Sequence, residues 1–83
     1  MMAFKDFIDL TYSIRDKDLL EDFLYGVTTT KERQELTRRV DIIKQLLADI
    51  PQHKIASDLG VGIATVTRGS RELSDGRFKA LRK

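Results

Sequence analysis

Apolar residues recur at helical spacing through the first third of the chain. Their i, i+3 and i+4 pattern predicts two amphipathic helices, one over about residues 3–15 and one over about residues 19–27, separated near Lys17–Asp18. Both apolar stripes are broad for so short a chain, which fits a face covered by another subunit. The positions that form them are Phe4, Phe7, Ile8, Leu10, Tyr12 and Ile14, and then Leu19, Leu20, Phe23, Leu24 and Val27.

A third helix is predicted between Thr29 and Ala48–Asp49. Thr29 and Glu32 have the spacing of a capping box, in which side chain and backbone satisfy each other's free amides at a helix start. The helix should end before Pro51, because the residue preceding a proline is biased away from helical angles. No segment has a strand pattern long enough for a sheet, so an all-α protein is predicted. The apolar stripe of this helix comprises Leu36, Val40, Ile43 and Leu47, widened by Ile42 and Leu46.

From Pro51 onward the pattern changes to two short helices around a tight turn. Gly60 follows the first helix (51–59) at the place where a left-handed backbone angle ends a helix, and a second helix begins at Gly62 or Ile63 and runs to about Leu73. Small Ala56 suits the closest approach of the two helices. The residues expected to face inward are Ile55, Leu59, Val61, Val66 and Leu73.

The outer face of the second helix carries small, hydroxyl and guanidinium groups. Ala64, Arg68 and Arg71 lie opposite the inward residues, with Thr65 and Thr67 on the flanks. Such a face suits a recognition helix in the major groove, because small residues permit close approach while Thr and Arg contact bases and phosphates. A plain helical corner that binds no nucleic acid is the alternative that the pattern leaves open.

Charge is distributed unevenly over the 83 residues, whose formal net charge is +2. Residues 51–83 carry seven Lys/Arg and three Asp/Glu, a net +4, whereas residues 1–50 carry a net −2. A basic C-terminal part suggests a polyanionic partner, with a solvated basic tail formed by Arg77, Lys79, Arg82 and Lys83 as the alternative.

Composition excludes several classes of function. Zero cysteines and a single histidine leave no thiolate metal site, disulfide or catalytic triad, and no second ligand stands near His53, so no metal or catalytic residue is predicted. No apolar run is long enough for a membrane span, and no signal peptide is recognisable, so a cytoplasmic protein is expected. A chain of this length buries a thin core, and oligomerisation is the expected remedy.

The run Leu59–Ser70 resembles the DNA-reading segment of the tryptophan operon repressor family, and Thr29–Arg33 with Leu36–Val40 resembles that family's central helix. This resemblance covers roughly residues 4–75. It implies an all-α intertwined homodimer of about five to six short helices with a helix-turn-helix. Members of this family are standard examples of helix-turn-helix dimers with largely water-mediated base contacts, so these expectations come from the resemblance itself.

The resemblance also implies the site residues. L-Tryptophan would act as corepressor, with its indole between the guanidiniums of Arg39 and Arg68, a chemically sensible stacking arrangement. Thr29 would lie near the ligand's amino end, Gly69 would leave room beside the ring, and Glu72 stands where the family has a serine for the ammonium. The residues matching DNA-facing positions are Gln52, His53, Ile63, Ala64, Thr65 and Thr67, to which the helix face adds Arg71.

Two further departures from the family pattern concern the segments around the reading head. The turn at 48–51 is one residue short, and the C-terminal segment 75–83 is only a short basic stretch in which Phe78 and Leu81 can still pack. The predicted organisation is one domain over 1–83, with dimerisation helices in 3–50, the helix-turn-helix in 51–74 and the short segment in 75–83.

Sequence reasoning therefore favours a tryptophan-responsive repressor that binds a palindromic double-stranded DNA operator as a homodimer. One alternative is a DNA-binding regulator of the same fold that has lost tryptophan or responds to another ligand, a hypothesis that Glu72 and the shortened turn at 48–51 motivate. The other is a helical dimerisation module that binds an acidic protein. Composition alone would make Arg39 an ordinary solvated charge, and Arg68 could equally contact DNA phosphate.

Overall fold

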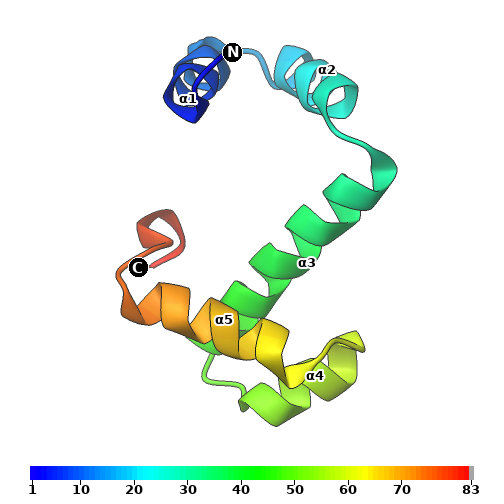
Figure 1. Cartoon of the computed structure of the whole chain (residues 1–83), viewed down its shortest axis with the longest axis vertical. Helices are drawn as coiled ribbons and strands as arrows, with labels where there is room; N and C mark the ends of the chain where they lie inside the picture. The colour runs from blue at the N-terminus through cyan, green and yellow to red at the C-terminus, as the bar shows by residue number, and fades with distance from the viewer. Residues whose placement is uncertain (83) are drawn as a thin grey trace. The chain divides into compact units, whose positions relative to one another are not determined.

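The computed structural model describes residues 1–82, and all regular structure in that range is helical (Figure 1). The predicted all-α class is confirmed. Five α-helices are followed by one 3₁₀ turn: α1 (Phe4–Ser13), α2 (Lys17–Val27), α3 (Thr30–Leu47), α4 (Gln52–Leu59), α5 (Ile63–Ser74) and η1 (Lys79–Leu81). Within residues 1–82, no helix is long and apolar enough to cross a membrane.

Two compact units divide the chain, and their boundary lies inside α3. The first unit, residues 1–33, contains α1, α2 and the first turn of α3. Neither α1 nor α2 has a buried residue. Their contact is aromatic: the Phe7 and Phe23 rings stack with centroids 5.8 Å apart, and Phe4 stacks on Phe7 at 5.9 Å. Because no residue of α1 or α2 is buried, this unit has no closed core of its own.

The predicted capping box begins α3. The amide of Thr29 donates to Glu32 Oε1 at 2.8 Å, and the amide of Glu32 donates to Thr29 Oγ1 at 3.1 Å. Arg33 joins the end of α2 to this helix start, since its guanidinium donates to the Thr28 carbonyl at 2.7 Å and lies 4.5 Å from the Tyr25 ring centroid. The reciprocal amide contacts hold the first turn of α3 in the way the sequence predicts.

The second unit, residues 34–83, has a small but fully closed core. Ile55 and Val66 are 0% exposed and Ile42 is 2% exposed, so α3, α4 and α5 meet at one cluster of branched side chains. Figure 1 shows α5 crossing the C-terminal part of α3. The partly buried apolar residues packed around the cluster are Leu46, Ile50, Ala56, Leu59 and Val61.

The helix-turn-helix forms as predicted. Gly60 adopts left-handed angles (φ 66°, ψ 34°) after α4, where a side chain would be strained, and Val61 donates its amide to the Ala56 carbonyl at 3.0 Å. Pro51 is the N-cap residue of α4, one position before the helix that was predicted to include it. The turn before it contains Asp49 at φ 62°, and Ile50 donates to the Gln45 carbonyl at 3.1 Å, which ends α3.

The apolar stripe predicted for α3 divides into two faces. Ile42 and Ile43 are buried, whereas Leu36 is 51% exposed and Val40 41% exposed. The spacing of the stripe could not separate these faces, because both contribute apolar residues to one broad pattern. The exposed face remains available to a partner.

After α5, the chain turns back on itself. Gly76 (φ 91°) and Phe78 (φ 64°) both have positive φ angles, and η1 follows. The Arg82 guanidinium donates to the carbonyls of Leu73 and Arg77. Arg82 is exposed, as expected for a basic tail, but it fastens this segment to the end of α5. The predicted segment also includes residue 83, which lies outside the described residues.

Candidate functional site

A recess in the second unit lies between α3, α5 and the segment after α5. Its volume of about 540 Å³ falls within the usual range of small-molecule sites, roughly 300–1,000 Å³. Its lining combines charged groups with apolar surface, which suits an amphipathic ligand. The lining residues are Arg39, Ile43, Ala64, Thr65, Arg68, Gly69, Glu72 and Phe78, and we call this recess the α3–α5 pocket.

Two guanidiniums and one carboxylate give the pocket its charge. Arg39 comes from α3 and Arg68 from α5, so the two cations are supplied by different helices. Glu72 lies one turn beyond Arg68 on α5, and its Oε2 is 3.6 Å from Nε of Arg77. The pocket can therefore meet a ligand carboxylate with Arg and a ligand ammonium with Glu72, while the planar guanidiniums offer stacking surface.

Gly69 allows α5 to lie close to α3. A Cβ at this position would be 3.2 Å from Ile42 Cγ2 and 3.2 Å from Ile43 Cδ1, tighter than ordinary van der Waals contact. The absence of a side chain at Gly69 therefore lets the backbone of α5 lie against the two isoleucines of α3. Because α3 and α5 carry the two arginines, this close approach also sets the width of the pocket between them.

Four of the five residues predicted to bind tryptophan meet in this pocket: Arg39, Arg68, Gly69 and Glu72. The fifth, Thr29, belongs to the first unit, where its hydroxyl and amide form the capping box. Thr29 is not among the pocket's lining residues, and its role near the ligand stays a prediction.

Two lining residues, Ile43 and Phe78, are not among the functional residues that the sequence predicts. The sequence places Ile43 in the apolar stripe of the third helix, and that pattern does not indicate that Ile43 also borders a recess. Phe78 was expected only to pack somewhere at the C-terminal end. The sequence does show a single aromatic residue in a basic segment that contains a glycine. Where the Phe78 side chain lies, however, depends on two positive φ angles that residue spacing does not reveal.

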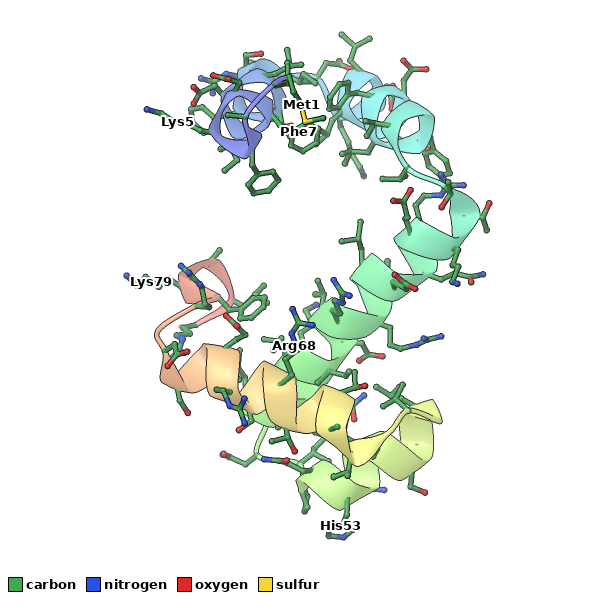
Figure 2. The ribbon with its side chains drawn as sticks, viewed as in Figure 1. Met1, Lys5, Phe7, His53, Arg68 and Lys79 are labelled. Carbon is green, nitrogen blue, oxygen red and sulfur yellow. The ribbon has the colours of Figure 1, made fainter. Side chains whose placement is uncertain are left out.

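The outer surface of the helix-turn-helix carries the predicted DNA-facing residues. Ile63 is 52% exposed, and His53 on α4 and Arg71 on α5 are exposed as well. Figure 2 shows the side chains of His53 and Arg68 pointing to different sides of the helix-turn-helix. Within residues 1–82, no group of His, Asp and Glu side chains could hold a metal ion.

A hydrogen bond fixes the two helices of this motif to each other. Thr67 Oγ1 is 3.0 Å from Gln52 Oε1 and 3.0 Å from the Ile63 carbonyl. Gln52 and Thr67 were both predicted to face DNA, and the structure brings them together from helices α4 and α5. Ala64 and Thr65 are exposed at the first turn of α5, and both also line the α3–α5 pocket.

Comparison with known proteins identifies the family. The model of the family described as Trp repressor protein matches residues 2–80. The chain belongs to the Trp repressor family. The resemblance seen in residues 59–70 is thereby confirmed, and because members of the Trp repressor family are DNA-binding regulators, the prediction that the chain is not an enzyme is confirmed too.

Individual relatives agree with this assignment to the Trp repressor family. The Trp operon repressor homolog of Vibrio campbellii is 45% identical over 67 residues, which cover 80% of this chain and 67% of that protein. Its counterpart in Vibrio cholerae is 42% identical over 67 residues, covering 80% of this chain and 65% of the other. The Chlamydia caviae homolog is 37% identical over 81 residues, covering 94% and 80%. The chain spans about two thirds of the length of the Vibrio relatives.

Proposed function

We propose that this chain is a tryptophan-responsive transcriptional repressor that binds a palindromic operator as a homodimer, with L-tryptophan as corepressor. Membership of the Trp repressor family supports the general function. The α3–α5 pocket supports the specific ligand, the exposed face of the helix-turn-helix supports the operator, and the exposed apolar side chains support the dimer.

One observation carries the proposal: α5 contributes to the pocket and to the outer surface of the helix-turn-helix at once. Arg68, Gly69 and Glu72 line the pocket, while Thr67 and Arg71 of the same helix are exposed outside it. A ligand that contacts both α3 and α5 fixes the angle of α5. Reading of successive major grooves depends on that angle, because two recognition helices must be spaced by about one helical turn, roughly 34 Å.

The charges of the pocket suit a zwitterionic aromatic amino acid. The indole ring would stack between Arg39 and Arg68, and Arg68 would also pair with the ligand carboxylate. Glu72 would accept from the ligand ammonium, provided that it exchanges its contact with Arg77 for this one. Ile43 supplies apolar surface at the edge of the ring.

Exposed apolar faces support the homodimer. Phe4 and Tyr12 on α1 are each 74% exposed, and Leu36 and Val40 on α3 border an open apolar recess. A single copy leaves this surface in contact with water, at a cost of about 25 cal/mol per Å² of apolar area. A second copy carries the same faces, so a symmetric pair would cover both.

The first experiment is selection of duplexes from a randomised pool, with and without L-tryptophan. The proposal predicts palindromic sites whose retention rises with the ligand. In the titration that follows, the binding constant should fall linearly with salt on a log–log plot. Failure to retain any duplex at low salt would instead favour the helical module that binds an acidic protein.

Paired arginine variants then test the pocket. Arg39→Gln should abolish the effect of tryptophan on duplex retention, because one stacking face is lost. Arg38→Gln is the matched control, since Arg38 is the neighbouring exposed arginine of α3 and does not line the α3–α5 pocket. Equal responses of the two variants would contradict a corepressor site at Arg39.

Glu72 favours a second candidate, a regulator of the same fold that responds to another small molecule. A carboxylate in the pocket repels a ligand carboxylate and attracts an amine. Tryptamine has the amine without the carboxylate, and indole-3-propionate has the carboxylate without the amine. Stronger enhancement of duplex binding by tryptamine than by L-tryptophan would support this second candidate.

A further inference from the structure

An aromatic ring reaches the α3–α5 pocket from outside the two helices that form most of it. Phe78 follows α5 by four residues, and it is half-buried at the edge of the pocket. The remaining lining comes from α3 and α5 alone. The segment 76–82 therefore adds a wall that neither helix provides.

An unusual backbone conformation directs the ring to this place. Phe78 has φ 64° and ψ 36°, a left-handed conformation that a bulky residue rarely adopts. Gly76 has φ 91°, so two positive φ angles within three residues turn the chain back toward α5. Such a conformation persists only where surrounding contacts hold it.

Those contacts are present on both sides of Phe78. The Arg82 guanidinium donates to the Leu73 carbonyl at the end of α5 and, from Nε at 3.3 Å, to the Arg77 carbonyl. Leu81 donates its amide to the Phe78 carbonyl at 3.0 Å. Arg77 Nε lies 3.6 Å from Glu72 Oε2, which connects the same segment to a pocket residue.

The ring borders the pocket without filling it. With Phe78 in place the recess still measures about 540 Å³, within the range of small-molecule sites. An aromatic wall beside two guanidiniums favours a flat aromatic ligand, because ring pairs gain stabilisation beyond their buried area.

We propose that Phe78 is a specificity-determining ligand contact, held against the pocket by the Arg82 guanidinium, and that it selects ligands with an aromatic ring. This inference rests on the proposed function, because it names a further contact of the same site. Arg82 acts through Phe78 and is a positioning residue.

Ligand fluorescence offers a direct test, because the chain contains no tryptophan. When the excitation wavelength is longer than those that tyrosine absorbs, the emission comes from L-tryptophan alone. The change in this emission on binding gives the dissociation constant. Phe78→Leu keeps apolar bulk and removes the ring face, and it should weaken binding about tenfold. Phe78→Tyr retains the ring and should stay within about threefold of the parent chain.

Arg82→Gln tests how the ring is held. Loss of its carbonyl contacts should weaken tryptophan binding about threefold, because the segment is then ordered only when ligand binds. Lys79→Gln is the matched control: it removes the same charge from the same segment, and Lys79 is exposed and points away from the pocket (Figure 2). This control should bind within about twofold of the parent chain. Helical circular dichroism verifies that each variant folds.

Nuclear Overhauser contacts between indole protons and the Phe78 ring, in chain labelled at phenylalanine, give a second readout independent of affinity. Contacts in the parent chain together with weakened binding by Phe78→Leu support the inference. If the parent chain binds tryptophan and Phe78→Leu binds equally or more tightly, the inference alone is overturned. No saturable binding by the folded parent chain would overturn the proposed corepressor as well.

Discussion

The two units of this chain bury their apolar side chains to very different extents. In the first, α1 and α2 have no buried residue, although Phe7 of α1 stacks on Phe23 of α2. In the second, Ile55 and Val66 are wholly buried although α4 is only eight residues long. A tight turn that sets two helices across a third closes a core with few residues, whereas two helices stacked by their aromatic rings do not. The second unit carries the candidate site, whereas the first leaves its apolar side chains exposed, as the homodimer that we propose would require.

Substituting one isoleucine in each unit gives the largest expected contrast. Ile55→Ala opens a cavity in the closed core and should lower the free energy of unfolding of the second unit by about 2–5 kcal/mol. Amide exchange measures this as lost protection in residues 52–74. Retained protection would contradict a core centred on Ile55.

Ile8→Ala is the matched change in the first unit, where Ile8 is 51% exposed. It should leave protection in 52–74 unchanged and should raise the concentration at which the chain self-associates, measured by sedimentation. Unaltered self-association would argue against α1 as part of the dimer surface.

Replacing one glycine in each unit should change the free energy of unfolding by about 1 kcal/mol, in opposite directions in the two units. Gly69→Ala gains helix propensity but forces a Cβ to 3.2 Å from Ile42 and Ile43, so we expect a net loss of about 1 kcal/mol in urea unfolding. Gly26→Ala in α2 meets no atom within 4 Å, and it should stabilise by about 0.5–1 kcal/mol. A stabilising Gly69→Ala would mean that α3 and α5 can separate freely.

Removing the hydroxyl that joins α4 to α5 has a smaller expected effect. Thr67→Val keeps the shape but loses the 3.0 Å contact with Gln52, and it should destabilise the second unit by about 0.5–1 kcal/mol. Thr65→Val, two residues earlier on α5, removes a hydroxyl that has no such bond to α4 in the described structure, and it should change stability by less than about 0.5 kcal/mol. Identical unfolding curves for the two variants would contradict a stabilising contact between Thr67 and Gln52.

The capping box of α3 gives the smallest effect, and it depends on pH. The backbone hydrogen bond from Thr29, and then its hydroxyl, lower the pKa of Glu32. A carboxyl with a lowered folded pKa stabilises at pH above its unfolded pKa, and this contribution is lost as pH falls through the folded pKa. The Thr29 amide resonance should follow that titration, and Glu32→Gln should abolish the pH dependence. A titration midpoint at or above that of an unfolded glutamate would contradict the capping contact.

Sequence reasoning found the elements that local chemistry determines. The capping box at Thr29 and the glycine turn at Gly60 each depend on neighbours a few residues away, and the structure has them as predicted. Of the residues predicted to face inward, Ile55 and Val66 are buried and Leu59 and Val61 pack against them, whereas Leu73 is only partly buried and lies outside this cluster. The resemblance added what spacing could not, placing Arg39 and Arg68 together although 28 intervening residues separate them in sequence.

Other features depend on contacts between elements, and they could not be predicted from the sequence. The division of the α3 stripe into buried Ile42 and exposed Leu36 follows from where α5 crosses, not from periodicity. The position of Phe78 follows from its positive φ and from the Arg82 contact, neither of which has a local pattern. The predicted single domain over 1–83 and the site roles of the named residues stay predictions.

The most direct measurement of the central claim is the affinity of the chain for L-tryptophan, with and without a saturating duplex from the selection. A ligand that sets the angle of α5 must tighten duplex binding, and the duplex must then tighten tryptophan binding by the same factor. We predict equal factors in the two titrations, both lost in Arg39→Gln. Saturable duplex binding with an unchanged tryptophan dissociation constant would contradict the account.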